Sequence, residues 1–446
     1  MTVHFYLCSC IRIIFDVIKL IKKIASIYKL FLRRLSLLSL MLPILFVSSL
    51  TQAQDIKQLE EALVRHPSLQ TLNYQSDASL ELAEAALGLP DPVLSFGINN
   101  FPFTDPSFTE FIPTNKSIGI SQQIPHLSGR KARSEIAKAQ SDELTLKYQQ
   151  RLSFMRAQLI GLLLNRDRIE QQQSLVQQQQ NKYKELITVL ESEIQAGNSI
   201  VFRLAEIERK RIELSRMLVD LQNQRSQIES SLNYLLGSIP STKAPEPIQL
   251  QQWSGNSNNF YSVAIAQAKI GIHEHRVEEA KAAWKPQWGA QLQYQQRESG
   301  DNFDGDDFLS AMVTVTIPIW SKRNQQPKLD AAQANKQSAI EDLNRIIRQA
   351  ETQYTNLKSD YSATINMLQL LEKEVTATED QIQALQINYE SGEGFYSPII
   401  DAQINHIKLK SEIIEHKTRA SIYVVQMNSL LMSESADNTI KGVEND

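Results

Sequence analysis

The sequence predicts a mainly α-helical chain with a small β part, in which one order of elements occurs twice. Three observations lead to this expectation. Apolar residues recur every seven positions over two very long segments that contain almost no helix breaker. Four short segments instead alternate between apolar and polar residues. One alternating segment in each half ends at Ile-Pro, at Pro125 or Pro318, and is followed by a basic pair and then by a long heptad segment.

The heptad segments predict two long helical hairpins, over 129–236 and 323–432. In the first half, apolar or aromatic residues recur at steps of seven from Tyr148 to Leu190 and again from Ile207 to Leu235. The same spacing runs from Ile340 to Tyr389 in the second half. Sustained heptads among polar residues indicate coiled-coil packing, and a helix of about 65 residues is roughly 100 Å long.

The alternating segments predict four strands, at about 93–101, 117–124, 287–297 and 309–318. Their apolar and polar residues would lie on opposite faces, because successive side chains of a strand point to opposite sides of a sheet. Two structures are compatible with such strands. One is a water-soluble sandwich with the apolar faces inside, and the other is a membrane β-barrel with the apolar face outside.

The two halves align as a two-fold internal repeat. Pro125 corresponds to Pro318, and Gly197 corresponds to Gly392. Each half is then expected to contain a helix, two strands, one very long helix, a glycine turn and a shorter helix. This alignment divides the chain into a first repeat at 54–245, a second repeat at 246–435 and a polar tail at 436–446.

Residues 1–53 are interpreted as a signal peptide with an extended N-terminus. Two arginines precede an apolar run from Leu35 to Leu50, and the small residue Ala53 follows it. A membrane anchor is the alternative, although the run is short for a span of about 20 residues. Cleavage would remove both cysteines, Cys8 and Cys10, together with seven Lys and Arg and one Asp. The remaining chain would be more acidic than the −4 of the full sequence, which argues against nucleic-acid binding.

Four strands are too few to close a membrane barrel, because the smallest barrels have eight. Open sheet edges are not tolerated in lipid. If the strands enter a membrane, several chains must therefore share one barrel, with the long helices extending from it. If they do not, the chain is a periplasmic coiled-coil scaffold without a pore.

In this arrangement the chain resembles the outer-membrane efflux proteins of the TolC family over roughly residues 55–435. The resemblance rests on the turn motifs "IQAGNSIVFRLAEIE" and "YESGEGFYSPIIDAQ" and on "LNYLLG" at the end of the first half. The stretch "LGLPDPVLSFGINNFP" is similar to the heavy-metal branch, the CzcC and CusC type. The family implies a homotrimer in the outer membrane, with a 12-stranded barrel and an α-helical periplasmic tunnel. It also implies a periplasmic adaptor and an inner-membrane pump of the RND type as partners.

The resemblance further implies a periplasmic gate at the tip of the tunnel. Tyr389 matches the tyrosine of the family's constriction network, and Asp401 matches an acidic position facing the lumen. Arg203 stands where the family has an acid, and Pro398 replaces another acid. We expect the guanidinium of Arg203 to pair with a carboxylate, either Glu393 or Asp401.

The same resemblance assigns the adaptor-docking turns to the two glycine breaks. The residues are Gly197 and Asn198 in the first turn, and Gly392 and Gly394 in the second. Glycine favours such positions because it adopts the left-handed conformation that ends many helices.

No catalytic motif, cofactor-binding motif or metal site is predicted, so the chain is not expected to be an enzyme. His273 and His275 lie two residues apart, which places them on different sides of a helix. The loop "GDNFDGDD" at 300–307 lacks the first ligand and the later Glu of a calcium loop. The predicted function is an exit duct for heavy-metal cations. A duct for drugs, a duct for type I protein secretion and the scaffold remain the alternatives.

Overall fold

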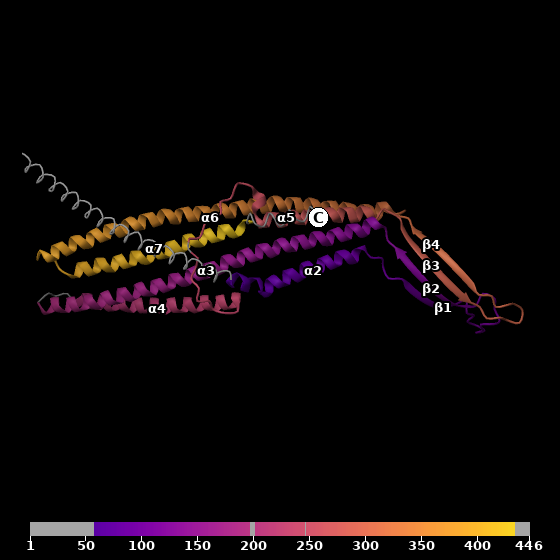
Figure 1. The fold of residues 1–446 in the computed structure, drawn as a ribbon, viewed down its shortest axis with the longest axis horizontal. Coiled ribbons are helices and arrows are strands. Elements are labelled where there is room, and N and C mark those ends of the chain that lie inside the picture. The colour runs from indigo at the N-terminus through magenta and orange to yellow at the C-terminus, as the bar shows by residue number, and fades with distance from the viewer. Residues whose placement is uncertain (1–57, 197–200, 246, 433–446) are drawn as a thin grey trace, which may run out of the picture.

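The computed structural model describes residues 58–432, except 197–200 and 246. The interpreted signal peptide, the docking residues Gly197 and Asn198, and the tail at 436–446 lie outside the described residues. The molecule is elongated, with a four-stranded sheet at one end and a long helical part extending from it (Figure 1).

The element order of the second half matches that of the first. The first half contains α2 (Pro67–Leu87), β1 (Val93–Asn99), β2 (Asn115–Ile124), α3 (Leu127–Gln195) and α4 (Val201–Leu236). After the 3-10 turn η1 (Ser257–Asn259), the second half contains α5 (Tyr261–Ala282), β3 (Gln287–Gln296), β4 (Phe308–Thr316), the turn η2 (Ser321–Arg323), α6 (Gln325–Glu390) and α7 (Ser397–Leu430). The expected mainly helical chain with four strands is therefore confirmed.

Helices α3 and α6 run nearly the whole length of the helical part. They contain 69 and 66 residues, which corresponds to roughly 100 Å each. Helix α3 begins at Leu127, two residues earlier than expected, because the ring of His126 accepts a hydrogen bond from the backbone N–H of Ser128. Helix α6 begins after the basic pair, which forms the turn η2, and Pro327 lies in its first turn, where no backbone donor is lost.

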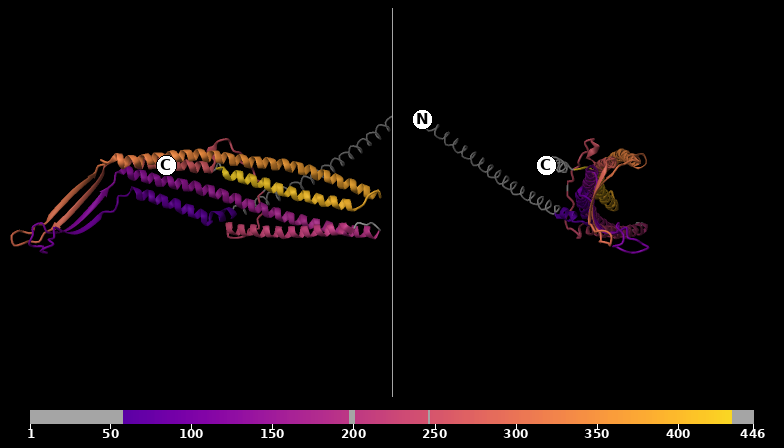
Figure 2. Two further views of the ribbon diagram at one scale, coloured as in Figure 1. Left: turned by 180° about the vertical axis from the view of Figure 1, so that it is seen from behind. Right: turned by 90° about the vertical axis from the view of Figure 1, so that its right-hand side faces the viewer.

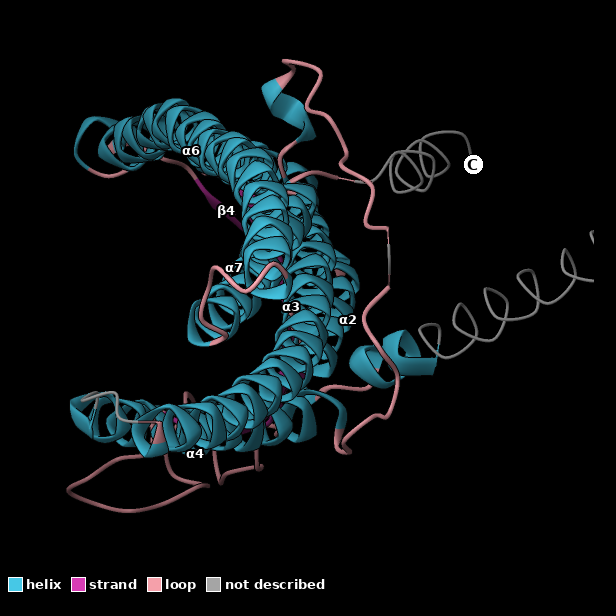
Figure 3. Cartoon of the chain, turned by 90° about the vertical axis from the view of Figure 1, so that its left-hand side faces the viewer, coloured by secondary structure: helices cyan, strands magenta, loops and turns pink. Residues whose placement is uncertain are grey.

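The other helices pack along these two and form a curved layer (Figures 2 and 3). In the half near the sheet, α2 packs on α3, and α5 packs between α3 and α6. In the far half, α4 packs on α3, and α7 packs between α3 and α6. Among the described residues, no helix is long and apolar enough to cross a membrane.

Three buried clusters supply the helix contacts at heptad positions. The first lies at mid-length and joins α2, α3 and α4, with Leu69, Leu163 and Leu232 among its members. The second lies in the far half and joins α3, α4 and α7. The third joins α5, α6 and α7 around Phe260 and Met427. The layer is therefore held by side-chain seams between neighbouring helices rather than by one central core.

The sheet has the strand order β1-β2-β3-β4, and each neighbouring pair is antiparallel. In the central pair, Ile120 lies opposite Leu292. Strand β1 ends at Asn99 rather than at Phe101, because Asn100 adopts a left-handed conformation with φ 52°. Strand β4 ends at Thr316, just before the Ile-Pro pair, since Pro318 has no N–H for the ladder.

The register divides the sheet into a mainly apolar face and a mainly polar face, because residues directly opposite each other share a face. Large apolar side chains on the first face remain exposed in the single chain; they are Leu94, Phe96, Ile98, Ile118, Ile120, Ile124, Trp288, Leu292, Tyr294, Leu309, Val313 and Val315. The other face carries mostly Ser, Thr, Asn and Gln, including the paired residues Gln293 and Ser310. Strands β1 and β4 form the two edges, and neither has a second strand partner among the described residues.

Candidate functional site

The residues of the expected gate lie at the end of the helical layer farthest from the sheet (Figure 1). Tyr389 is the second-last residue of α6, Arg203 lies in the first turn of α4, and Asp401 lies in the first turns of α7. Glu393 lies in the turn between α6 and α7. The fold therefore places all four residues at this end of the helical layer.

An ion pair joins the two hairpins at this end. Arg203 Nη2 lies 2.5 Å from Asp401 Oδ2, and Arg203 Nη1 donates to Ser397 Oγ at 2.6 Å. Ser397 and Asp401 lie four residues apart on one face of α7, so one guanidinium reaches both. The side chains of Arg203 and Asp401 are 29% and 47% exposed, and a pair of this exposure stabilises the chain by about 0.2–1 kcal/mol.

The other two expected gate residues take no part in this ion pair. The carboxylate of Glu393 is exposed and forms no ion pair with a residue that the structure describes. Of the two carboxylates expected for Arg203, the structure therefore brings only Asp401 to it. The ring of Tyr389 instead packs against the ring of Tyr396, with centroids 5.2 Å apart.

A second polar link between the hairpins was not expected from the sequence. The hydroxyl of Tyr396 donates to Glu185 Oε1 at 2.9 Å, which connects α7 to α3. Lys182 Nζ lies 2.8 Å from the other oxygen of Glu185. The hydrogen bond and charge of Lys182, together with the Tyr396 hydroxyl, lower the pKa of Glu185 below its usual range. The hydrogen bond between Tyr396 and Glu185 also raises the pKa of Tyr396, because the hydroxyl must keep its proton to donate it.

Apolar side chains lie beneath these polar links. Ile400 and Leu190 are fully buried, and Tyr183 and Ile207 pack in the same cluster. Burial, followed by the charge of Asp401, raises the pKa of Tyr183, so its ring stays uncharged at neutral pH. The start of α7 is therefore fixed to α3 and α4 of the same chain by packing as well as by polar contacts.

Gly392 ends α6 in a left-handed conformation, with φ 77°. The N–H of Gly392 donates to Tyr389 O at 3.0 Å, and the N–H of Glu393 donates to Asn388 O at 3.1 Å. This pair of bonds is a Schellman motif, which satisfies carbonyl groups that the helix end leaves free. At Gly394 a side chain is limited by space rather than by backbone conformation, because an added Cβ would lie 3.3 Å from Tyr389 N.

The described residues contain no group of three or more His, Cys, Asp or Glu that could hold a metal ion. In the loop at 300–307, the carboxylate of Asp307 accepts a hydrogen bond from the hydroxyl of Tyr294. The N–H of Gly300 donates to Phe303 O in the same loop. The contacts at this loop are therefore made within the chain.

We expect Glu185 to make stability depend on pH. Its folded-state pKa is lowered, so its contribution is fully present above the usual glutamate pKa of about 4.3 and is lost as pH falls through the lower folded value. Glu185→Gln should therefore lose less thermal stability than the parent between pH 6 and pH 3. Glu191→Gln, on an exposed part of the same helix, is the control. Equal losses in the parent and the Glu185 variant would contradict the assigned link.

The fold is similar to that of solved outer-membrane channels. The outer membrane protein VceC from Vibrio cholerae is 14% identical with a TM-score of 0.68, and the match covers 85% of this chain and 97% of VceC. CusC, which forms a transmembrane channel, is 14% identical with a TM-score of 0.69 over 85% of this chain and 92% of CusC. The open-state outer membrane channel MtrE from Neisseria gonorrhoeae is 16% identical with a TM-score of 0.65, and the match covers 84% of this chain and 88% of MtrE. No protein-family model and no curated protein sequence matches the chain. The chain therefore has the fold of these outer-membrane channels.

Proposed function

We propose that three copies of this chain form an outer-membrane channel that serves as the exit duct of a tripartite efflux system. The observation that carries this proposal is the sheet, with its exposed apolar face and two unpaired edges. Lipid accommodates the apolar face, but it does not tolerate open edges. Three copies supply 12 strands, and pairing β1 of each copy with β4 of the next closes a barrel without edges.

The curved helical layer supports the same assembly. Helices α4 and α6 form its two lateral borders (Figure 3). Both helices carry large exposed apolar side chains, such as Phe202 and Val219 on α4 and Leu370 and Ile387 on α6. In a ring of three copies, α4 of one copy would lie beside α6 of the next and cover these side chains. The concave faces would then enclose a tunnel that extends into the periplasm by roughly the 100 Å length of the long helices.

The partners that we propose are a periplasmic adaptor and an inner-membrane pump of the RND type. The proposed cargo is heavy-metal cations, and the role is conduction rather than catalysis. One observation supports the cargo, namely the resemblance of residues 87–102 to the heavy-metal branch. The signal peptide at 1–53 would direct the chain out of the cytoplasm.

Cell fractionation combined with growth tests examines this function. The chain should appear in outer-membrane fractions as a trimer that dissociates on heating. Deletion of its gene should raise sensitivity to heavy-metal salts, and the intact gene should restore resistance. A soluble periplasmic species would support the scaffold instead. Sensitivity to drugs alone, or loss of a secreted protein, would assign the duct to those cargoes.

We further propose that Arg203, Asp401, Tyr389 and Glu393 form the periplasmic gate. Three copies of Asp401 around the narrow end would favour cations once their ion pairs with Arg203 open, because like charges in a restricted pore concentrate counter-ions. The Arg203–Asp401 pair holds α7 against α4 and thereby keeps the end closed. The turns at Gly197, Asn198, Gly392 and Gly394 would dock the adaptor.

The gate predicts two different conductance changes in reconstituted trimers. Arg203→Ala should raise the open fraction while retaining cation selectivity, because the link between hairpins is lost and the acid remains. Asp401→Asn should weaken cation selectivity as well, because the charge itself is removed. Lys210→Ala is the control, since the ion pair that Lys210 forms among the described residues is with Glu213 of the same helix. If both gate variants conduct like the parent, the constriction lies elsewhere.

The docking turn predicts that Gly392→Val abolishes efflux while trimers still form. A β-branched residue at φ 77° is strained, which would disturb the turn but not the distant sheet. Resistance in growth assays and trimer content in outer-membrane fractions measure the two effects. Loss of the trimer itself would mean that the turn is required for folding, which would remove the support for docking.

The barrel predicts different tolerance of arginine on the two sheet faces. Val313 lies on the apolar face and is 69% exposed in the single chain, while the adjacent Thr314 lies on the polar face. Val313→Arg should lower the stability of the folded barrel by about 2–4 kcal/mol if it lies near the bilayer centre. Thr314→Arg should cost much less, because it faces the lumen. Denaturant titration in lipid vesicles compares them, and equal tolerance would argue against a membrane strand.

A further inference from the structure

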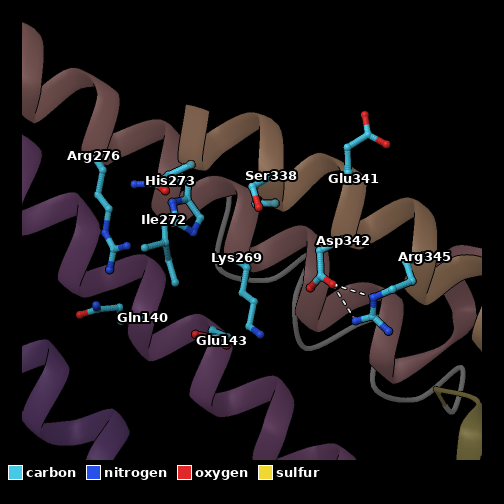
Figure 4. A pocket seen from close by; sticks show the side chains of 12 residues that line it. Gln140, Glu143, Lys269, Ile272, His273, Arg276, Ser338, Glu341, Asp342 and Arg345 are labelled. Atoms are coloured by element: carbon cyan, nitrogen blue, oxygen red, sulfur yellow. Dashed lines mark hydrogen bonds and ion pairs between the residues drawn. The ribbon is translucent and has the colours of Figure 1, made fainter. Parts of the chain in front are cut away.

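A groove in the half of the helical layer near the sheet is used neither by the gate nor by the docking turns. It lies between α3, α5 and α6 and has a volume of about 600 Å³. Lys269, His273 and Arg276 on α5 contribute to its wall at spacings of four and three residues. This spacing places them on one face of the helix, where neighbouring side chains meet. Figure 4 shows Lys269 and Arg276 extending from α5 toward α3.

The acidic residues at this groove do not neutralise these cations. Glu143 on α3 pairs with Lys147 of its own helix at 2.8 Å. Asp342 on α6 pairs with Arg345 at 2.6 Å, and Glu341 points away from the groove (Figure 4). Lys269 and Arg276 form no hydrogen bond or ion pair with a residue that the structure describes. Two cations therefore face the groove without a partner.

His273 adds a third polar group that lacks a protein partner. Its Nδ1 is buried and forms no hydrogen bond with a described residue. Burial, followed by the charges of Arg276 and Lys269, lowers the pKa of His273. Burial is the largest cause of this shift, and the two cations add to it because nearby positive charges disfavour a further proton on the imidazole. The walls add neutral polar groups from Gln140 and Ser338.

We propose that this groove binds a small anion that carries more than one phosphate group. Arg276 supplies a planar fork that matches phosphate oxygens, and Lys269 supplies a second, mobile cation. These residues lie seven positions apart, about 10 Å along the helix, which favours a ligand with more than one anionic group. His273 adds a ring nitrogen between them. The phosphates can belong to a soluble molecule or to a lipid headgroup, since the recognising chemistry is the same.

Isothermal titration calorimetry of the purified full chain with sodium tripolyphosphate tests the site, with sodium chloride holding ionic strength constant. One saturable site per chain is expected. Lys269→Gln/Arg276→Gln should weaken binding by at least about tenfold, because two charge-assisted contacts are lost. The matched control is Lys281→Gln/Lys285→Gln, which removes the same charge from exposed residues beyond the groove. Circular dichroism verifies that each variant is folded.

Three results would overturn the proposal. They are absence of saturable binding in the parent, unchanged affinity in the groove variant, and equal weakening in the control variant, which would indicate diffuse charge attraction. Glu143→Gln gives a test of opposite sign, because removing this acid should tighten binding; weaker binding would also contradict the site. Competition by cardiolipin, whose headgroup carries two phosphate groups, in detergent micelles would assign the site to a lipid headgroup, and lack of competition would assign it to a soluble anion. These measurements do not depend on channel activity.

Discussion

The whole fold depends on α3 and α6 remaining helical without interruption over their full length. Each is far too polar to be buried on all sides, and each is stabilised only where a neighbouring helix covers its heptad residues. Helix α3 receives α2 and α5 in one half and α4 and α7 in the other. A shift of α3 by a single residue would therefore misplace four helices and two strands at once. This requirement explains why Gly161 is the only helix breaker between Gly129 and Gly197.

Sequence periodicity was sufficient to predict the type of each long element and of each strand. Steps of seven indicated the helices and steps of two indicated the strands, because these periods follow from backbone geometry itself. The ends of helices and strands are harder to predict from the sequence than their type. Strand β1 stops at Asn100 because of one left-handed residue, and α3 starts early because of the ring of His126. Both effects depend on a single side chain and leave no periodic signal.

The candidate site was predictable only in part for a related reason. Periodicity and family resemblance identified Arg203 and Asp401, but they did not identify which carboxylate the guanidinium meets. The Tyr396–Glu185 link was missed because heptads assign a residue to a helix face without saying which helix lies opposite. Only the packing of α7 against α3 brings these residues together, across 211 positions of the sequence. The groove at Lys269 has walls from three helices that are far apart in the sequence, so residue spacing along one helix does not predict it.

The pairing of β2 with β3 has a consequence for the order of folding. Residues such as Ile120 and Leu292 are about 170 positions apart, whereas each long hairpin is built from contacts between helices adjacent in sequence. Closing so large a loop has a high entropic cost unless other contacts hold its ends together first. The hairpins, and the α3–α5 contact beside the sheet, supply such contacts. We therefore expect the sheet to form after the helical contacts, with the apolar residues of the strands unpaired until then.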